Sequence, residues 1–182
     1  MGVLRLEATK KGKEIPVVMV SELDPNFKYE VAKQPGGEGI KRCFACGTCS
    51  AGCPIRAIDE KYNPRKIIRM VLLGMKERVL SSDFIWLCST CYTCYERCPQ
   101  DVRLVDIMRV LKNMAVKEGY IHPLYKEQMR LINSYGTVYK IENRRRERYG
   151  LPPFKSEAKE IEEIFKMTGV DDLLKTKGAD KK

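Results

Sequence analysis

The sequence has few of the features that mark a membrane protein or a histidine-ligated metal site. None of its apolar stretches approaches the roughly 20 residues that a membrane-spanning helix needs. Histidine occurs once among 182 residues, as His122. A Rieske cluster needs two histidine ligands and is therefore excluded. The place of His122 directly before Pro123 favours a helix-cap or surface role over metal ligation. We expect no contact with a membrane.

Nucleotide-binding and hydrolytic motifs are also missing. The 13 glycines form neither G-x-G-x-x-G nor the phosphate-binding P-loop pattern. No Ser-His-Asp set and no open-site metal triad can be recognised. We therefore expect no flavin or nucleotide in this chain and no catalytic residue of its own.

The start of the sequence lacks the pattern of a secretory signal. It reads MGVLR and continues with charged residues, without the apolar core of a signal peptide. We expect the protein to lie in the cytoplasm, where thiols stay reduced and disulfide bonds are rare. The formal net charge of +10 suits docking to an acidic partner surface.

The sequence does contain one internal repeat, and it uses all 8 cysteines. Residues 43–54 read CFACGTCSAGCP and residues 88–99 read CSTCYTCYERCP. Both follow the spacing C-x-x-C-x-x-C-x-x-x-C-P, which is the bacterial ferredoxin pattern of four-iron ligation. The repeat predicts two [4Fe-4S] clusters in one chain.

Two other uses of cysteine compete with this interpretation. Four-cysteine zinc sites are built from paired C-x-x-C knuckles, but a third cysteine two residues on and the C-x-x-x-C-P ending are not expected there. A disulfide framework would need a secretory context, which the sequence does not offer. Iron-sulfur ligation is therefore favoured over both.

The spacing also predicts which cysteines share a cluster. Three thiolates on one tight loop converge on three irons of a cubane, and in two-cluster proteins of this type the last cysteine of each motif ligates the other cluster. The predicted ligands of cluster 1 are Cys43, Cys46, Cys49 and Cys98. The predicted ligands of cluster 2 are Cys88, Cys91, Cys94 and Cys53. Crossed ligation requires the two clusters to be neighbours.

A proline follows the last cysteine of each motif. Pro54 and Pro99 suit the first position of a helix, where the missing N–H costs nothing. We expect a helix to begin at each cluster and to turn its positive end toward the anionic cofactor, which favours the reduced state.

The segments around the motifs read as helices. Asn63 can cap a helix that starts at Pro64 and places apolar residues on one face through Met75. Residues 102–118 show a second apolar stripe, and Gly119 suits its C-terminal cap. The strand-like alternation of the small ferredoxin fold is missing, so the sequence predicts a mainly α protein with the all-helical ferredoxin fold.

The flanks complete the expected organisation. Residues 1–39 form an N-terminal arm, with a possible short β-hairpin from residues 3–7 and 15–20. Residues 40–120 form the helical two-cluster core. Residues 121–174 hold further helices for packing or docking, one from Pro123 to about Asn133 and one after Ser156. Residues 175–182 are expected to be a disordered tail.

A basic run, Arg144-Arg145-Arg146-Glu147-Arg148, lies between Tyr139 and Tyr149. Basic residues mixed with aromatics can bind nucleic acid. A solvated helical face or a protein-docking surface is favoured instead, because the iron-sulfur proteins that handle DNA resemble one another in single clusters with wider cysteine spacing. We expect no nucleic-acid partner.

These observations predict an electron relay. Every cysteine is committed to a cluster, and the substrate site must lie on another protein of a complex. A freely diffusing ferredoxin is the alternative, but such proteins are usually smaller and acidic. A cluster-containing nucleic-acid-binding regulator is a second alternative.

At this level of detail the sequence resembles a known family. The motifs CFACGTCSAGCP and CSTCYTCYERCPQDV, the segment NPRKIIRMVLLG and the segment VDIMRVLKNMAVKEG resemble the iron-sulfur C subunit of the soluble CoB-CoM heterodisulfide reductase of methanogenic archaea, over residues 23–150. Related helical iron-sulfur proteins of succinate dehydrogenase, glycolate oxidase and glycerol-3-phosphate dehydrogenase carry further cluster or CCG domains, which this sequence lacks.

The resemblance implies a route for electrons. A hydrogenase or formate dehydrogenase supplies electrons to the flavin subunit of heterodisulfide reductase, which contains FAD and iron-sulfur clusters. The flavin subunit passes them through the two cubanes of the C subunit to the catalytic subunit, which reduces the CoM-S-S-CoB heterodisulfide in methanogenesis. The resemblance carries over all eight cysteines as ligands and assigns no catalytic residue. Related cytoplasmic oxidoreductases share this iron-sulfur protein, so a complex with another substrate is the alternative.

Overall fold

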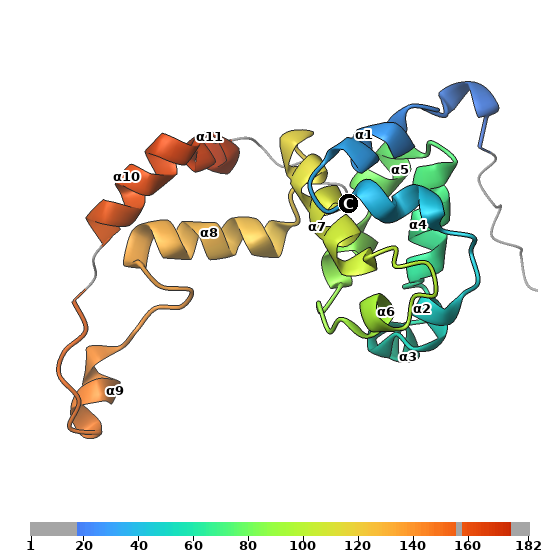
Figure 1. Ribbon diagram of the computed structural model, residues 1–182. Coiled ribbons are helices and arrows are strands. Elements are labelled where there is room, and N and C mark those ends of the chain that lie inside the picture. The colour runs from blue at the N-terminus through green and yellow to red at the C-terminus, as the bar shows by residue number, and fades with distance from the viewer. Residues whose placement is uncertain (1–17, 156–157, 176–182) are drawn as a thin grey trace, which may run out of the picture.

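The structure is a computed structural model that describes residues 18–155 and 158–175 (Figure 1). Every regular element in these residues is helical, which confirms the mainly α fold. Residues 3–7 and 15–17 of the expected hairpin lie outside the described part. Val20, the end of its second strand, instead opens the 3-10 turn η1 (Val20–Glu22) and is 81% exposed.

The compact half of the molecule is built from short helices around the two motifs. In chain order they are α1 (Phe27–Lys33), η2 (Glu38–Arg42), α2 (Thr48–Ala51), α3 (Pro54–Ile58), α4 (Pro64–Leu72), α5 (Lys76–Leu80), η3 (Asp83–Leu87), α6 (Thr93–Glu96) and α7 (Leu104–Lys117). Helices α2 and α6, one from each motif, pack against each other. The two copies of the sequence repeat are therefore in contact in the folded chain.

Helix α4 starts as its sequence predicts. The Asn63 side chain accepts a hydrogen bond from the Lys66 amide at 3.1 Å, and Pro64 takes the first helical position. The helix ends earlier than expected, because Gly74 adopts a left-handed φ of +79°. A Cβ atom there would lie 2.2 Å from the carbonyl oxygen of Asp24, so only glycine lets the two segments approach so closely.

Helix α7 begins later than the sequence predicts. Pro54 opens α3 as expected, but no helix begins at Pro99, since Asp101 and Arg103 take left-handed conformations that α-helices do not contain. The first helical residue is Leu104. The expectation that a helix starts directly at both fourth cysteines is therefore wrong for Cys98.

The buried core lies between α1, α4, η3 and α7. Its fully buried side chains include Phe27, Ile68, Ile85, Ile107 and Leu111. Among the described residues, no apolar side chain after Ile121 is buried. The core therefore supports the two cysteine loops rather than the C-terminal helices.

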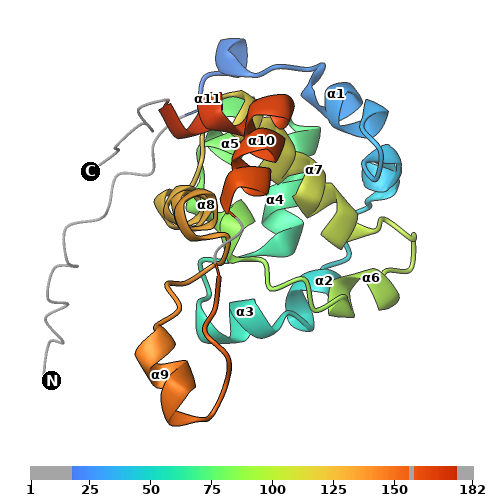
Figure 2. The ribbon, with the colours of Figure 1, turned by 90° about the vertical axis from the view of Figure 1, so that its left-hand side faces the viewer.

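The C-terminal helices extend from this core as an arm. They are α8 (Pro123–Tyr135), α9 (Asn143–Arg148), α10 (Ala158–Thr168) and α11 (Val170–Lys175). Figures 1 and 2 show α10 beside α8, and α9 at the end of a separate loop. Lys175, expected in the disordered tail, ends α11; residues 176–182 lie outside the described part.

His122 joins the arm to the core in the role predicted for it. Its ring nitrogen accepts a hydrogen bond from the Leu124 amide at 3.3 Å and so caps α8. The Trp86 ring of η3 packs against Tyr125 with 5.0 Å between ring centroids. Of the helices in the described residues, none has the length and apolarity to span a bilayer.

Candidate metal centre

The two cysteine motifs fold into loops with matching backbone conformations. In the first loop, Ala45 and Gly47 have φ angles of 60° and 89°; in the second, Thr90 and Tyr92 have φ angles of 52° and 62°. A left-handed conformation costs roughly 1–2 kcal/mol for a residue other than glycine. Three such residues in two loops represent strain of the kind that is concentrated at functional sites.

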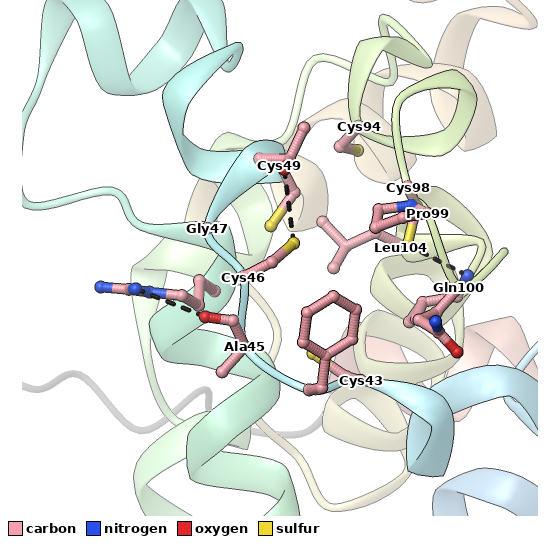
Figure 3. Close-up of a pocket in the computed structure, with 14 residues that line it drawn as sticks. Cys43, Ala45, Cys46, Gly47, Cys49, Cys94, Cys98, Pro99, Gln100 and Leu104 are labelled. Atoms are coloured by element: carbon pink, nitrogen blue, oxygen red, sulfur yellow. Dashed lines mark hydrogen bonds between the residues drawn. The ribbon is translucent and has the colours of Figure 1, made fainter.

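The first three cysteines of the first motif and the last cysteine of the second line one pocket (Figure 3). This pocket therefore brings together the four cysteines predicted to hold cluster 1. It is lined by Cys43, Cys46, Cys49 and Cys98, and also by Cys94, Phe44, Arg65 and Leu104. The Val102 amide donates a hydrogen bond to the Cys98 sulfur at 3.4 Å and holds this cysteine in place.

The buried Tyr62 marks the site predicted for cluster 2. Burial raises the pKa of the Tyr62 hydroxyl, and the nearby sulfurs of Cys88, Cys53 and Cys94 raise it further. Three of the four predicted ligands thus lie near enough to act on one hydroxyl. The fourth, Cys91, is exposed.

The environments of the thiols differ in the same way in both loops. The thiols of this structure stand for the thiolates that would bind iron. Thr48 Oγ1 lies 3.3 Å from the Cys46 sulfur and Thr93 Oγ1 lies 3.5 Å from the Cys91 sulfur. These hydrogen bonds lower the pKa of both exposed thiols. Each loop therefore favours the thiolate form at its exposed cysteine.

The third cysteine of each loop is half-buried, and its thiol is harder to ionise. Burial raises the pKa of Cys49, and burial raises that of Cys94 to about 12, with further contributions from nearby sulfurs. Metal binding requires the thiolate, so iron bound by these cysteines would have to displace both protons. The positive charge of the metal offsets the cost of burying these two thiolates.

The donor set suits a cubane. In residues 18–155 and 158–175, no three His, Cys, Asp or Glu side chains lie close enough together to share a single metal ion. A [4Fe-4S] cluster makes a different demand, because each of four thiolates binds a separate iron. The thiols that converge here, with hydroxyl and amide groups beside their sulfurs, therefore suit a [4Fe-4S] cluster.

Sequence reasoning missed the polar contacts that fix the first loop to α4. The Ser50 hydroxyl is buried, donates to the Asn63 side chain at 2.7 Å and accepts from the Arg65 amide at 3.0 Å. Asn63 was predictable as a helix cap, but a serine inside a cysteine motif carries no signal for this contact. Tyr62 was also missed, because it lies outside both motifs and its sequence neighbours carry no signal that it packs near their cysteines.

The basic run lies on α9, which forms a lobe away from α2 and α6, the helices of the two cysteine motifs (Figure 1). The Asn143 side chain binds the Phe154 backbone through both of its polar atoms, at 2.8 and 3.3 Å, and Arg146 Nε donates to the Pro152 carbonyl at 2.8 Å. These bonds close the loop and leave Tyr139, Tyr149 and most of the arginines exposed.

Comparison with known proteins gives consistent matches. The family described as a 4Fe-4S dicluster domain matches residues 39–102. An iron-sulfur C subunit of CoB-CoM heterodisulfide reductase from Methanocaldococcus jannaschii is 37% identical over 162 residues, covering 81% of this chain and 86% of the relative.

Two further relatives come from other methanogens. The C subunit of the H₂:CoB-CoM heterodisulfide, ferredoxin reductase of Methanothermobacter thermautotrophicus is 33% identical over 89% of this chain and 92% of the relative. The C subunit of the ferredoxin:CoB-CoM heterodisulfide reductase of Methanosarcina mazei is 31% identical over 78% and 92% respectively. The similarity thus extends well beyond the cysteine motifs.

Proposed function

The chain belongs to the family of heterodisulfide reductase C subunits, and from this premise we propose that it relays single electrons from a flavin-containing subunit to a catalytic one. Membership makes it an iron-sulfur electron-transfer component of an oxidoreductase complex. The direction of transfer, the partners and the place of the reaction in the cytoplasm are part of the proposal.

The observation that carries the proposal is the meeting of the two motifs. Cys98 of the second motif lies in one pocket with Cys43, Cys46 and Cys49. Cys53 of the first motif lies near the same hydroxyl as Cys88 and Cys94. Two [4Fe-4S] clusters bound in this way would be neighbours and would supply two one-electron carriers. We assign all eight cysteines to them as in the crossed scheme, and the dicluster match favours iron over zinc.

The residues of this chain hold and insulate the carriers, and they perform no bond chemistry. Reduction of CoM-S-S-CoB takes two electrons and two protons and yields two thiols. We place that reaction on the catalytic subunit, with electrons supplied to the flavin subunit by a hydrogenase or a formate dehydrogenase. The names of the relatives, which mention hydrogen and ferredoxin, support a reductase complex of this kind.

The C-terminal arm supports stable docking rather than free diffusion. In the described residues its helices have no buried apolar side chain, while Leu124, Ile164 and Met167 are exposed. Exposed apolar faces of this kind are typical of contact surfaces between proteins. We therefore propose that residues 121–174 hold this chain in its complex.

A reconstituted complex tests the relay. Without this chain, the flavin of the flavin subunit should still be reduced, and formation of the two thiols at the catalytic subunit should stop. Adding the holoprotein back should restore product formation, and adding a Cys46→Ser, Cys91→Ser double variant should not. Full turnover in the absence of this chain would disprove the proposal.

A further inference from the structure

Arg65 is held against the first cysteine loop at both of its ends. Its backbone amide donates to Ser50 Oγ at 3.0 Å, and its Nη1 donates to the Ala45 carbonyl at 3.5 Å. A Cβ atom on Gly47 would lie 3.3 Å from the same Nη1. The guanidinium group thus lies on the backbone between Cys43 and Cys49 and lines their pocket.

The charge of Arg65 is not neutralised by a neighbour. In the described part of the chain, no carboxylate forms an ion pair with it, and its guanidinium donates to the Ala45 carbonyl. An arginine side chain is not deprotonated in proteins. The first loop therefore carries a fixed positive charge.

The second loop has a cation too, but that cation is paired. Tyr92 stands where the first loop has Gly47, and Arg109 of α7 lies over the Tyr92 ring, 5.8 Å from its centroid, and hydrogen bonds to its hydroxyl. The Arg109 guanidinium also forms an ion pair of 3.0 Å with Asp106. The Asp106 carboxylate therefore balances the charge of Arg109, whereas Arg65 has no such partner among the described residues.

This difference has a redox consequence, since a reduced cluster carries one more negative charge than an oxidised one. Net charge near an iron-sulfur cluster is one of the factors that set its reduction potential. We propose that Arg65 makes cluster 1, held by Cys43, Cys46, Cys49 and Cys98, the higher-potential member of the pair. The inference rests on the proposed two-cluster function and adds an order to it. An electron that enters the pair would then reside mainly beside Phe44, which is 61% exposed.

Redox titration of the anaerobically purified holoprotein, followed by electron paramagnetic resonance, tests this order. The Cys46→Ser variant identifies the signal of cluster 1. Arg65→Gln, which removes the charge, should lower the midpoint potential of cluster 1 alone. The difference between the midpoint potentials of the two clusters should therefore become smaller. Arg65→Lys should retain most of this difference in midpoint potential. Lys66→Gln, which removes a neighbouring cation of α4, should leave both potentials unchanged.

A reciprocal variant tests the same electrostatics without touching the first loop. Asp106→Asn removes the partner of Arg109 and should raise the midpoint potential of cluster 2. Unchanged potentials in Arg65→Gln with full iron content would overturn the inference, as would equal shifts in Arg65→Gln and Arg65→Lys. Fewer than two four-iron clusters in the unaltered protein would instead overturn the proposed function.

Discussion

The side chain of Arg97 lies over Gly52, the residue that holds the same position in the other cysteine motif. A Cβ atom on Gly52 would lie 2.9 Å from Arg97 Nη1 and 3.5 Å from Thr93 Cγ2. Both residues directly precede the fourth cysteine of their motif. Where the two motifs meet, the space holds one long side chain, and the glycine of the first motif leaves room for the arginine of the second.

A large residue at position 52 should therefore separate the motifs. We expect Gly52→Leu to destabilise the holoprotein by about 1–3 kcal/mol, as overpacking does elsewhere, and to lower its iron content. Gly52→Ala should have little effect, because the contacting atom is the end of a flexible arginine. Thermal unfolding and iron analysis measure both, and a Gly52→Leu protein as stable as the original would contradict this account.

Crossed ligation predicts which cluster each fourth cysteine serves. Cys98→Ser should alter the spectrum of the cluster held by Cys43, Cys46 and Cys49, since Cys98 lies in their pocket. Cys53→Ser is the matched variant and should alter the other cluster. Resonance spectra of the two variants should differ in the signal that changes. If each variant instead lost only the signal of the cluster held by the other three cysteines of its own motif, the crossed arrangement would be ruled out.

Removal of iron should unfold most of the helical core. The ligands converge from distant segments, and in small metalloproteins the free energy of metal binding contributes directly to folding. Without iron, the half-buried thiols of Cys49 and Cys94 would also lie near each other with no metal bound to either. Circular dichroism of the chelator-treated protein should show a large loss of helix; a native-like spectrum would refute the prediction.

Lys76 joins three helices and should stabilise the fold over a defined pH range. Its Nζ lies 2.9 Å from Glu30 of α1 and 3.3 Å from Glu118 at the end of α7. The hydrogen bond to Glu30, followed by that to Glu118, raises the pKa of Lys76. The contribution should therefore be complete below the ordinary lysine pKa of about 10.4 and should disappear as pH rises through the higher folded-state value.

A lysine variant checks this sign. Lys76→Met should reduce the free energy of unfolding by about 0.5–1 kcal/mol, equally from pH 7 to pH 9. Lys61→Met, which removes an exposed lysine from a loop, is the control and should have a smaller effect. Denaturant unfolding at several pH values gives the result. A stability difference that grows above pH 10 would show that the sign is wrong.

The basic lobe predicts a salt-dependent protein contact. Arg144→Glu together with Arg145→Glu should weaken assembly of the reductase complex by at least about tenfold at low salt, because like charges would face an acidic partner. Lys61→Glu with Lys66→Glu makes the same change in charge on exposed residues outside the arm and should weaken assembly less. If the protein bound RNA or DNA, and if the double variant bound it more weakly, the nucleic-acid alternative would be favoured instead.

Much of the fold could be predicted from local patterns. Asn63 and Pro64 indicated the start of α4, and Gly119 and Gly136 stand at the ends of α7 and α8 with left-handed φ angles. These signals are local, since a cap needs only neighbouring residues. The start of α7 could not be predicted, because Pro99 permits a helix but the loop that positions Val102 beside Cys98 requires left-handed residues.

The sequence by itself determined the kind of ligand and the number of ligands. It contains two identical cysteine spacings, and the short distance in sequence between cysteines limits how far apart their sulfurs can lie in each loop. The tertiary structure decided what surrounds each loop. It placed Tyr62 near Cys88, Arg65 on the backbone of the first loop and Arg97 over Gly52. It also paired Arg109 with Asp106 and gave Arg65 no such partner among the described residues. The field at each site depends on distances between segments far apart in the chain, and only folding fixes those distances.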